Sequence, residues 1–74
     1  MSNTKSWSEF HMDYISHYGN VGDGRRATVC KYGEAFVELL LWYQGCGFNP
    51  KKMEFRSVLE AQEYGKAWVD GEIL

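Results

Sequence analysis

The alternation of apolar and charged positions near the end of the chain predicts a strand that runs directly into a helix. Residues 53–56 alternate between apolar and charged side chains, which is the two-residue period of a half-buried strand. Ser57 and Glu60 follow at the spacing of a capping box, in which the serine hydroxyl accepts the Glu60 amide proton and the glutamate reaches back to the Ser57 amide. Gly71 can adopt the left-handed conformation that closes a helix. We therefore expect a capped helix from Ser57 to Gly71.

Residues 7–18 show the apolar spacing of a second helix, which Gly19 would end. Ser6 and Glu9 match the capping-box pattern again. The large apolar side chains of this segment recur at helical spacing: Trp7, Phe10, Tyr14, Ile15 and Tyr18. The sequence therefore predicts an N-terminal helix, although the alternation of Phe, Met and Tyr over residues 10–14 also fits a strand.

The middle of the chain contains two further segments with a regular pattern. Residues 27–32 read as a strand, and Gly33 begins a turn. Residues 35–44 fit either element: Ala, Leu and Glu favour a helix, whereas the flanking glycines and the Val, Phe, Trp and Tyr residues favour a strand. We predict a strand for this segment.

A strand over residues 35–44 would be apolar on both faces. One face would carry Val37, Leu39, Leu41 and Tyr43, and the other Phe36, Leu40 and Trp42 with Glu38 and Gln44. Strands of this kind are normally covered on both sides. The C-terminal helix can cover one face, so the other needs the N-terminal helix, a second copy of the chain or a partner.

These elements predict an α+β fold, with a small three-stranded antiparallel meander, a C-terminal helix packed on one face and an N-terminal helix. The 74 residues allow a single domain, with a βββα core over about 27–72 and a disordered segment at 1–5. A hydrophobic content of 45% argues against intrinsic disorder. So short a chain buries only roughly 60–65% of its unfolded surface, which leaves little interior in which to enclose a substrate.

Groups that could carry catalysis or hold a metal are few. His11 and His17 would lie about 240° apart around a helix, so they could not share a metal ion there. Nothing in the sequence places a histidine beside Cys30 to activate its thiol. Residues 22–24 carry the glycines of a dinucleotide-binding loop, but they follow a predicted helix instead of a strand. We predict that the protein is not an enzyme and that it uses neither a cofactor nor a metal.

The charge and the cysteine content limit the classes of partner and the cellular compartments that we expect. Eight basic and ten acidic residues give a net charge of −2, which is not the basic footprint of a non-specific nucleic-acid binder. The basic pairs Arg25-Arg26 and Lys51-Lys52 nevertheless leave an RNA- or DNA-binding module as an alternative. The two cysteines form no CxxC motif, and we find neither a signal-peptide pattern nor a span long enough for a bilayer. We therefore expect a cytoplasmic protein with free thiols and no contact with membranes.

Four short motifs carry a family resemblance. They are Tyr32-Gly33-Glu34-Ala35-Phe36-Val37, Trp42-Tyr43-Gln44-Gly45, Phe55-Arg56-Ser57 and the helix pattern Glu60-Ala61, Tyr64, Trp68-Val69 and Gly71. Over about residues 27–72 this arrangement resembles the βββα domains of small early proteins of tailed bacteriophages, from which the long loop at 45–52 and the N-terminal extension depart. The resemblance implies a host-takeover or anti-defence protein that acts in the host cytoplasm, where it binds and blocks a host protein. It transfers no site residues.

We therefore predict a small non-catalytic protein that binds and inhibits or redirects a bacterial host protein, such as a defence, transcription or replication factor. Aromatic side chains and arginine dominate binding hot spots. The candidate partner-binding residues are Arg25, Arg26, Phe36, Leu40 and Trp42. Besides the nucleic-acid module, a homodimeric accessory protein is an alternative, in which a second copy covers the exposed apolar face.

Overall fold

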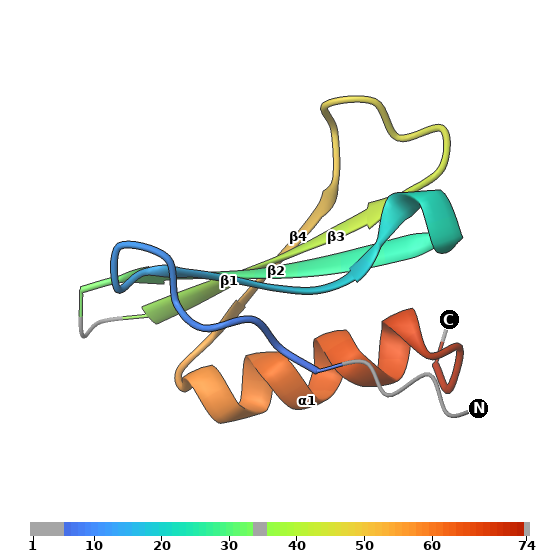
Figure 1. Ribbon diagram of the computed structural model, residues 1–74. Helices are drawn as coiled ribbons and strands as arrows, with labels where there is room; N and C mark the ends of the chain where they lie inside the picture. Colours follow the sequence, from blue (N-terminus) through green and yellow to red (C-terminus); the bar gives the residue numbers. More distant parts are fainter. Residues whose placement is uncertain (1–5, 34–35, 74) are drawn as a thin grey trace.

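The fold is a four-stranded antiparallel sheet with one helix packed on one face (Figure 1). The computed structural model describes residues 6–33 and 36–73. Its elements are β1 (Ile15–Asn20), the short 3₁₀ turn η1 (Val21–Asp23), β2 (Arg25–Tyr32), β3 (Phe36–Tyr43), β4 (Lys51–Phe55) and α1 (Val58–Val69). The strands lie in the order in which they occur in the chain. The predicted α+β class is confirmed.

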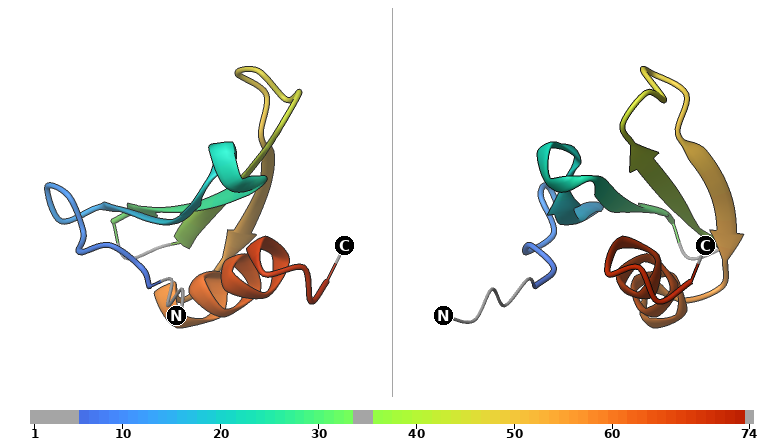
Figure 2. Two further views of the ribbon diagram at one scale, coloured as in Figure 1. Left: turned by 45° about the vertical axis from the view of Figure 1, so that its right-hand side comes forward. Right: turned by 90° about the vertical axis from the view of Figure 1, so that its right-hand side faces the viewer.

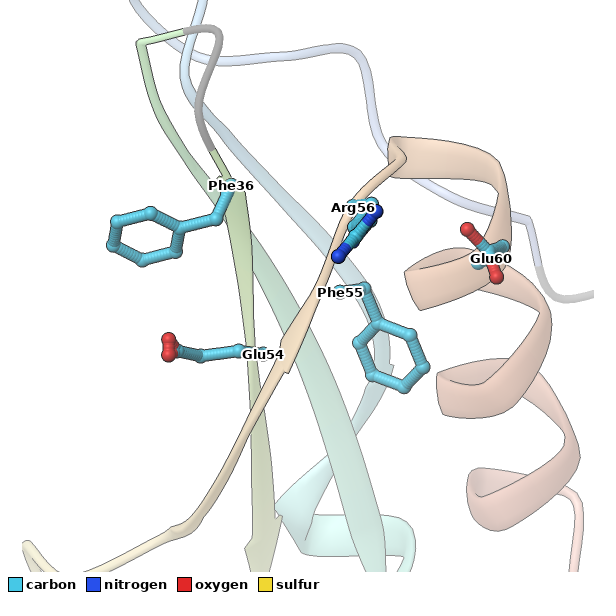
Figure 3. A pocket seen from close by; sticks show the side chains of 5 residues that line it. All are labelled: Phe36, Glu54, Phe55, Arg56 and Glu60. Atoms are coloured by element: carbon cyan, nitrogen blue, oxygen red, sulfur yellow. The ribbon is translucent and has the colours of Figure 1, made fainter.

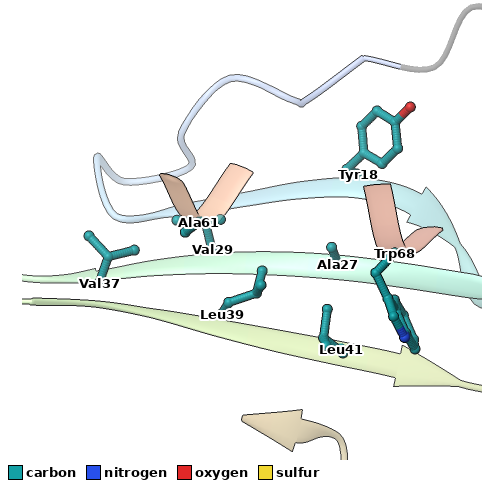
Figure 4. Close-up of a cluster of buried hydrophobic side chains, with 8 residues drawn as sticks. All are labelled: Tyr18, Ala27, Val29, Val37, Leu39, Leu41, Ala61 and Trp68. Atoms are coloured by element: carbon teal, nitrogen blue, oxygen red, sulfur yellow. The ribbon is translucent and has the colours of Figure 1, made fainter. Parts of the chain in front are cut away.

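The core lies between the sheet and α1 (Figure 4). Because side chains alternate along a strand, the register that pairs Ala27 with Leu41 and Val29 with Leu39 brings their side chains together on the same face. The buried apolar residues are Tyr18, Ala27, Val29, Val37, Leu39, Leu41, Ala61 and Trp68. The core therefore includes β1, through Tyr18, which lies before the predicted 27–72 segment.

The structure confirms the predicted C-terminal helix and its cap. The Ser57 hydroxyl oxygen accepts a hydrogen bond from the Glu60 N–H at 3.1 Å. The Glu60 carboxylate, however, accepts from the Ser57 hydroxyl, also at 3.1 Å. At the other end Gly71 has a φ of 81°. The N–H groups of Gly71 and Glu72 bond to the carbonyls of Trp68 and Ala67, which is the Schellman arrangement for ending a helix.

The predicted N-terminal helix over residues 7–18 is wrong. The chain turns back at Met12 and Asp13, whose φ values are 51° and 69°, and then forms β1. Ser8 lies along the outer side of β1, where its N–H donates to the His17 carbonyl and its hydroxyl accepts from the His17 N–H. Trp7 contacts the Tyr18 ring at a centroid distance of 5.3 Å. Residues that looked like neighbours on a helix thus meet through a chain reversal.

The three-stranded meander is also wrong, because β1 adds a fourth strand that pairs with β2. The predicted strand at 27–32 is confirmed and begins earlier, at Arg25. The ambiguous segment at 35–44 is a strand, over Phe36–Tyr43, and Ala35 lies outside the described residues. So does the segment at 1–5, for which we predicted disorder.

Candidate protein-binding face

One face of the sheet has no covering layer among residues 6–33 and 36–73. α1 and the segment at 6–10 lie on the same side of the sheet (Figures 1 and 2). We name the opposite side the open face; it carries Arg26, Thr28 and Cys30 of β2 and Phe36, Leu40 and Trp42 of β3. The sheet therefore presents aromatic and aliphatic side chains on a surface that α1 does not reach.

Four of the five predicted partner-binding residues lie on this face. Phe36 is 38% exposed, and its ring lies 5.4 Å from that of Tyr32, which is 48% exposed. Trp42 lies opposite Arg26 in the register, and Leu40 lies opposite Thr28. The alternation within β3 thus groups Phe36, Leu40 and Trp42 as expected.

Arg25 lies on the other face. Its guanidinium donates to the Trp68 carbonyl at 2.6 Å and lies 4.5 Å from the centre of the Trp68 ring. These contacts hold the C-terminal end of α1 against β2. Arg25 and Arg26 were predicted to act together, but adjacent residues of a strand point to opposite faces. Only Arg26 is placed to contact a partner on the open face.

A hydrogen-bond network fixes the Trp42 ring. The indole N–H donates to the Thr28 hydroxyl at 3.1 Å, and that hydroxyl lies 2.8 Å from Nδ1 of His17. The Thr28 hydroxyl thus links the indole of Trp42 to the imidazole of His17. The pKa of His17 lies below its ordinary value of 6.5, mainly because of burial and further because of the positive charges of Arg26 and His11.

Sequence reasoning missed His17 and Thr28 as parts of this site. Their contact depends on the pairing of β1 with β2, in which His17 lies opposite Thr28. The available signal was the alternation within residues 15–18, where Ile15 and His17 point to one face and Ser16 and Tyr18 to the other. Because we predicted a helix for this segment, we did not use that alternation.

Charges on the open face are separated along the strands. The Nε atom of Arg26 is buried and has no hydrogen-bond partner in the described part of the chain. Glu38 and Glu54 lie directly opposite each other on β3 and β4. Like charges at such positions destabilise a sheet. The Arg26 and Glu38 positions lie four residues apart along the ladder, or about 13 Å at ~3.3 Å per residue. One end of the face therefore favours an acidic group and the other a basic group.

In the described part of the chain, the other side chains that could take part in catalysis or metal binding do not lie together. Cys30 is only 6% exposed, and burial, with the nearby Glu38 charge, raises the pKa of its thiol, which makes it a poor nucleophile. Both cysteines are free thiols. Among the described residues, no three His, Cys, Asp or Glu side chains come together to hold a metal ion. Within the same residues, no helix has the length and apolar character needed to cross a bilayer.

Two clefts lie at the margins of the sheet. A cleft of about 480 Å³ lies where β4 ends and is lined by Phe36, Glu54, Phe55, Arg56 and Glu60 (Figure 3). In this view Phe36 and Glu54 point away from α1, whereas Phe55 points toward it. A second cleft of about 400 Å³ is lined by Arg25, Tyr43, Lys51 and Trp68. Lys51 thus lies with Arg25 on the α1 side, so the two predicted basic pairs are each divided between the two faces.

Comparisons with protein-family models, with curated proteins and with solved structures gave no match. The resemblance to early proteins of tailed bacteriophages therefore stays a prediction.

Proposed function

We propose that this protein is a non-catalytic binding protein and that a partner protein docks on its open face. The observation that carries the proposal is the position of Trp42. Its ring is held by Thr28 on a face that no described segment covers, beside the Nε atom of Arg26, which has no hydrogen-bond partner among the described residues. A fixed aromatic ring loses little conformational entropy on binding, and Trp and Arg are the residues most enriched in binding hot spots.

The chemistry of the face defines the partner. Leu40, Trp42 and Phe36 need an apolar protein surface, and Arg26 needs a carboxylate that can bind its guanidinium in a planar, two-point contact. The resemblance to phage early proteins adds the proposal that the partner is a bacterial host protein, which is inhibited or redirected by occlusion. The nucleic-acid alternative has less support, because Arg25 is committed to the Trp68 carbonyl.

The experiment compares three tagged proteins in a pull-down from nuclease-treated bacterial lysate. These are the wild type, Trp42→Ala and Leu59→Ala, the last of which alters an exposed apolar side chain of α1 away from the open face. We expect the wild type and Leu59→Ala to retain one protein in near-stoichiometric yield and Trp42→Ala to lose it. The purified partner should then bind Trp42→Ala at least tenfold more weakly in calorimetry, in line with the roughly 2 kcal/mol of a hot-spot residue.

Circular dichroism checks that Trp42→Ala is folded, and Phe36→Asp replaces it if it is not. A partner that binds these open-face variants as well as it binds the wild type would contradict the proposal. So would a partner that is lost only with Leu59→Ala.

A further inference from the structure

The two edges of the sheet differ in how they are protected. At β1, Ser8 occupies part of the outer side through its two hydrogen bonds to the His17 backbone. β4 pairs with β3 on one side, and no described residue pairs with its other side. Figure 2 shows β4 at the outer margin of the sheet. An open edge presents backbone donors and acceptors to another strand.

We propose that two copies of the chain associate through their β4 edges, antiparallel about a twofold axis at Met53, to form a continuous eight-stranded sheet. In this register Lys52 lies opposite Glu54 of the second copy, and Glu54 lies opposite Lys52 of the second copy. Both pairs lie on the open face, because Lys52 and Glu54 share the face of Leu40 and Glu38. Opposite charges directly across an antiparallel pair stabilise it.

The charge pattern of β4 selects this register over its neighbours. A shift of the axis to Lys52 places two lysines directly opposite each other, and a shift to Glu54 places two glutamates there. A one-residue slip would place even-numbered residues opposite odd-numbered ones. It would therefore join the open face of one copy to the α1 face of the other. Within β4, only the axis at Met53 places opposite charges across from each other on matching faces. An axis at Phe55 would oppose Glu54 to Arg56, which lies beyond the end of the strand. Charges that merely protected an edge would not need this self-complementary order.

The same register places a positively charged side chain, Lys52 of the second copy, beside the Glu38–Glu54 pair. In the described part of a single chain, neither Glu54 nor Lys52 takes part in an ion pair. In the dimer, the row of side chains would run from Glu38 through Glu54 to Lys52 of the second copy. On the α1 side, Met53 would meet its own copy and Lys51 would meet Phe55. The open face stays uncovered in this arrangement, so the dimer and the proposed partner site are independent.

The test is a charge-reversal series measured by sedimentation equilibrium over a wide range of protein concentration. We expect the wild type to dimerise, more weakly at high salt because the pairs are exposed. Lys52→Glu and Glu54→Lys, each measured alone, should weaken dimerisation roughly ten- to hundredfold, because each places like charges in both pairs. An equimolar mixture of the two variants should form a heterodimer, and the double swap Lys52→Glu/Glu54→Lys should restore the homodimer.

Glu63→Lys, a reversal at an exposed position of α1, is the control and should dimerise like the wild type. Circular dichroism checks the fold of each variant. A wild type that is monomeric at every concentration would overturn the proposal. A dimer whose affinity is unchanged by the β4 charge reversals would overturn it as well. So would a dimer that is lost with Trp42→Ala, which would place the contact on the open face. Loss of partner capture in a variant that still dimerises would count against the proposed function alone.

Discussion

At the scale of single residues, His17 joins an outer strand to the centre of the open face. Its Nδ1 lies 2.8 Å from the Thr28 hydroxyl, which also holds the Trp42 indole. Burial is the largest cause that lowers the pKa of His17, and the positive charges of Arg26 and His11 further oppose a charged imidazole. The folded protein therefore favours the neutral form of His17.

This arrangement predicts a stability that falls with acid. The unfolded chain titrates His17 near 6.5, whereas its pKa in the folded protein is lower. Between these two values the unfolded state binds more protons, so the free energy of unfolding falls as the pH drops through this window. Urea denaturation followed between neutral and mildly acidic pH measures the effect. We expect His17→Gln to reduce this slope and His11→Gln, which also removes one imidazole, to keep most of it. An unchanged slope in His17→Gln would contradict this role.

At the scale of elements, α1 lies close to the sheet because Gly65 has no side chain. A Cβ atom at this position would lie 2.9 Å from the Ala27 Cβ, 3.1 Å from Leu39 Cδ1 and 3.2 Å from a ring carbon of Trp7. These neighbours come from β2, β3 and the N-terminal segment, and Ala27 and Leu39 are fully buried. The glycine thus sets the distance between the two layers.

Gly65→Ala should therefore destabilise the protein, although the same change in an exposed helix stabilises it by about 1 kcal/mol. Overpacking of a well-filled core costs typically about 1–3 kcal/mol, and we expect a loss of that size in the free energy of unfolding. Equilibrium urea denaturation measures it. An increase in stability would show that α1 can move away from the sheet at little cost.

The same scale explains which elements could be predicted from the sequence. All the signals for α1 are local: the Ser57 cap, the apolar period and Gly71 lie within one segment. Residues 7–18 offered equally good local signals for a helix, but Trp7 and Tyr18 reach the core from opposite sides of a turn. β1 instead pairs with β2, the strand that follows it across the short turn η1. The spacing of apolar residues within 7–18 does not contain that pairing.

The candidate site was predictable to the extent that it lies on one strand. The two-residue period of β3 grouped Phe36, Leu40 and Trp42 without knowledge of any other strand. Thr28 and His17 required the pairing of β1 with β2, which the sequence did not reveal. We placed Arg25 on the wrong face because two adjacent basic residues in a loop can form one patch. In a strand, by contrast, their side chains point to opposite faces of the sheet.

At the scale of the whole molecule, one helix covers one face and the other face is only partly shielded by its own side chains. Thr28 and Cys30 are 3% and 6% exposed without any covering layer among the described residues. His17 and Trp42, on the two neighbouring strands, both contact the Thr28 hydroxyl. Thr28 and Cys30 are therefore already shielded from water, whereas Phe36 on the same face is exposed.

Cys30 can consequently report which surface a second protein occupies. Its thiol should react with an alkylating reagent more slowly than that of Cys46, because it is buried and its pKa is raised. Association through β4 leaves the open face uncovered, so the Cys30 rate should be the same in dilute and in concentrated protein. Occupation of the open face by a partner should lower that rate. Labelling followed by mass spectrometry resolves the two thiols, and Cys46→Ser isolates Cys30. A Cys30 rate that falls as the protein self-associates would place the second copy on the open face and exclude the edge-to-edge dimer.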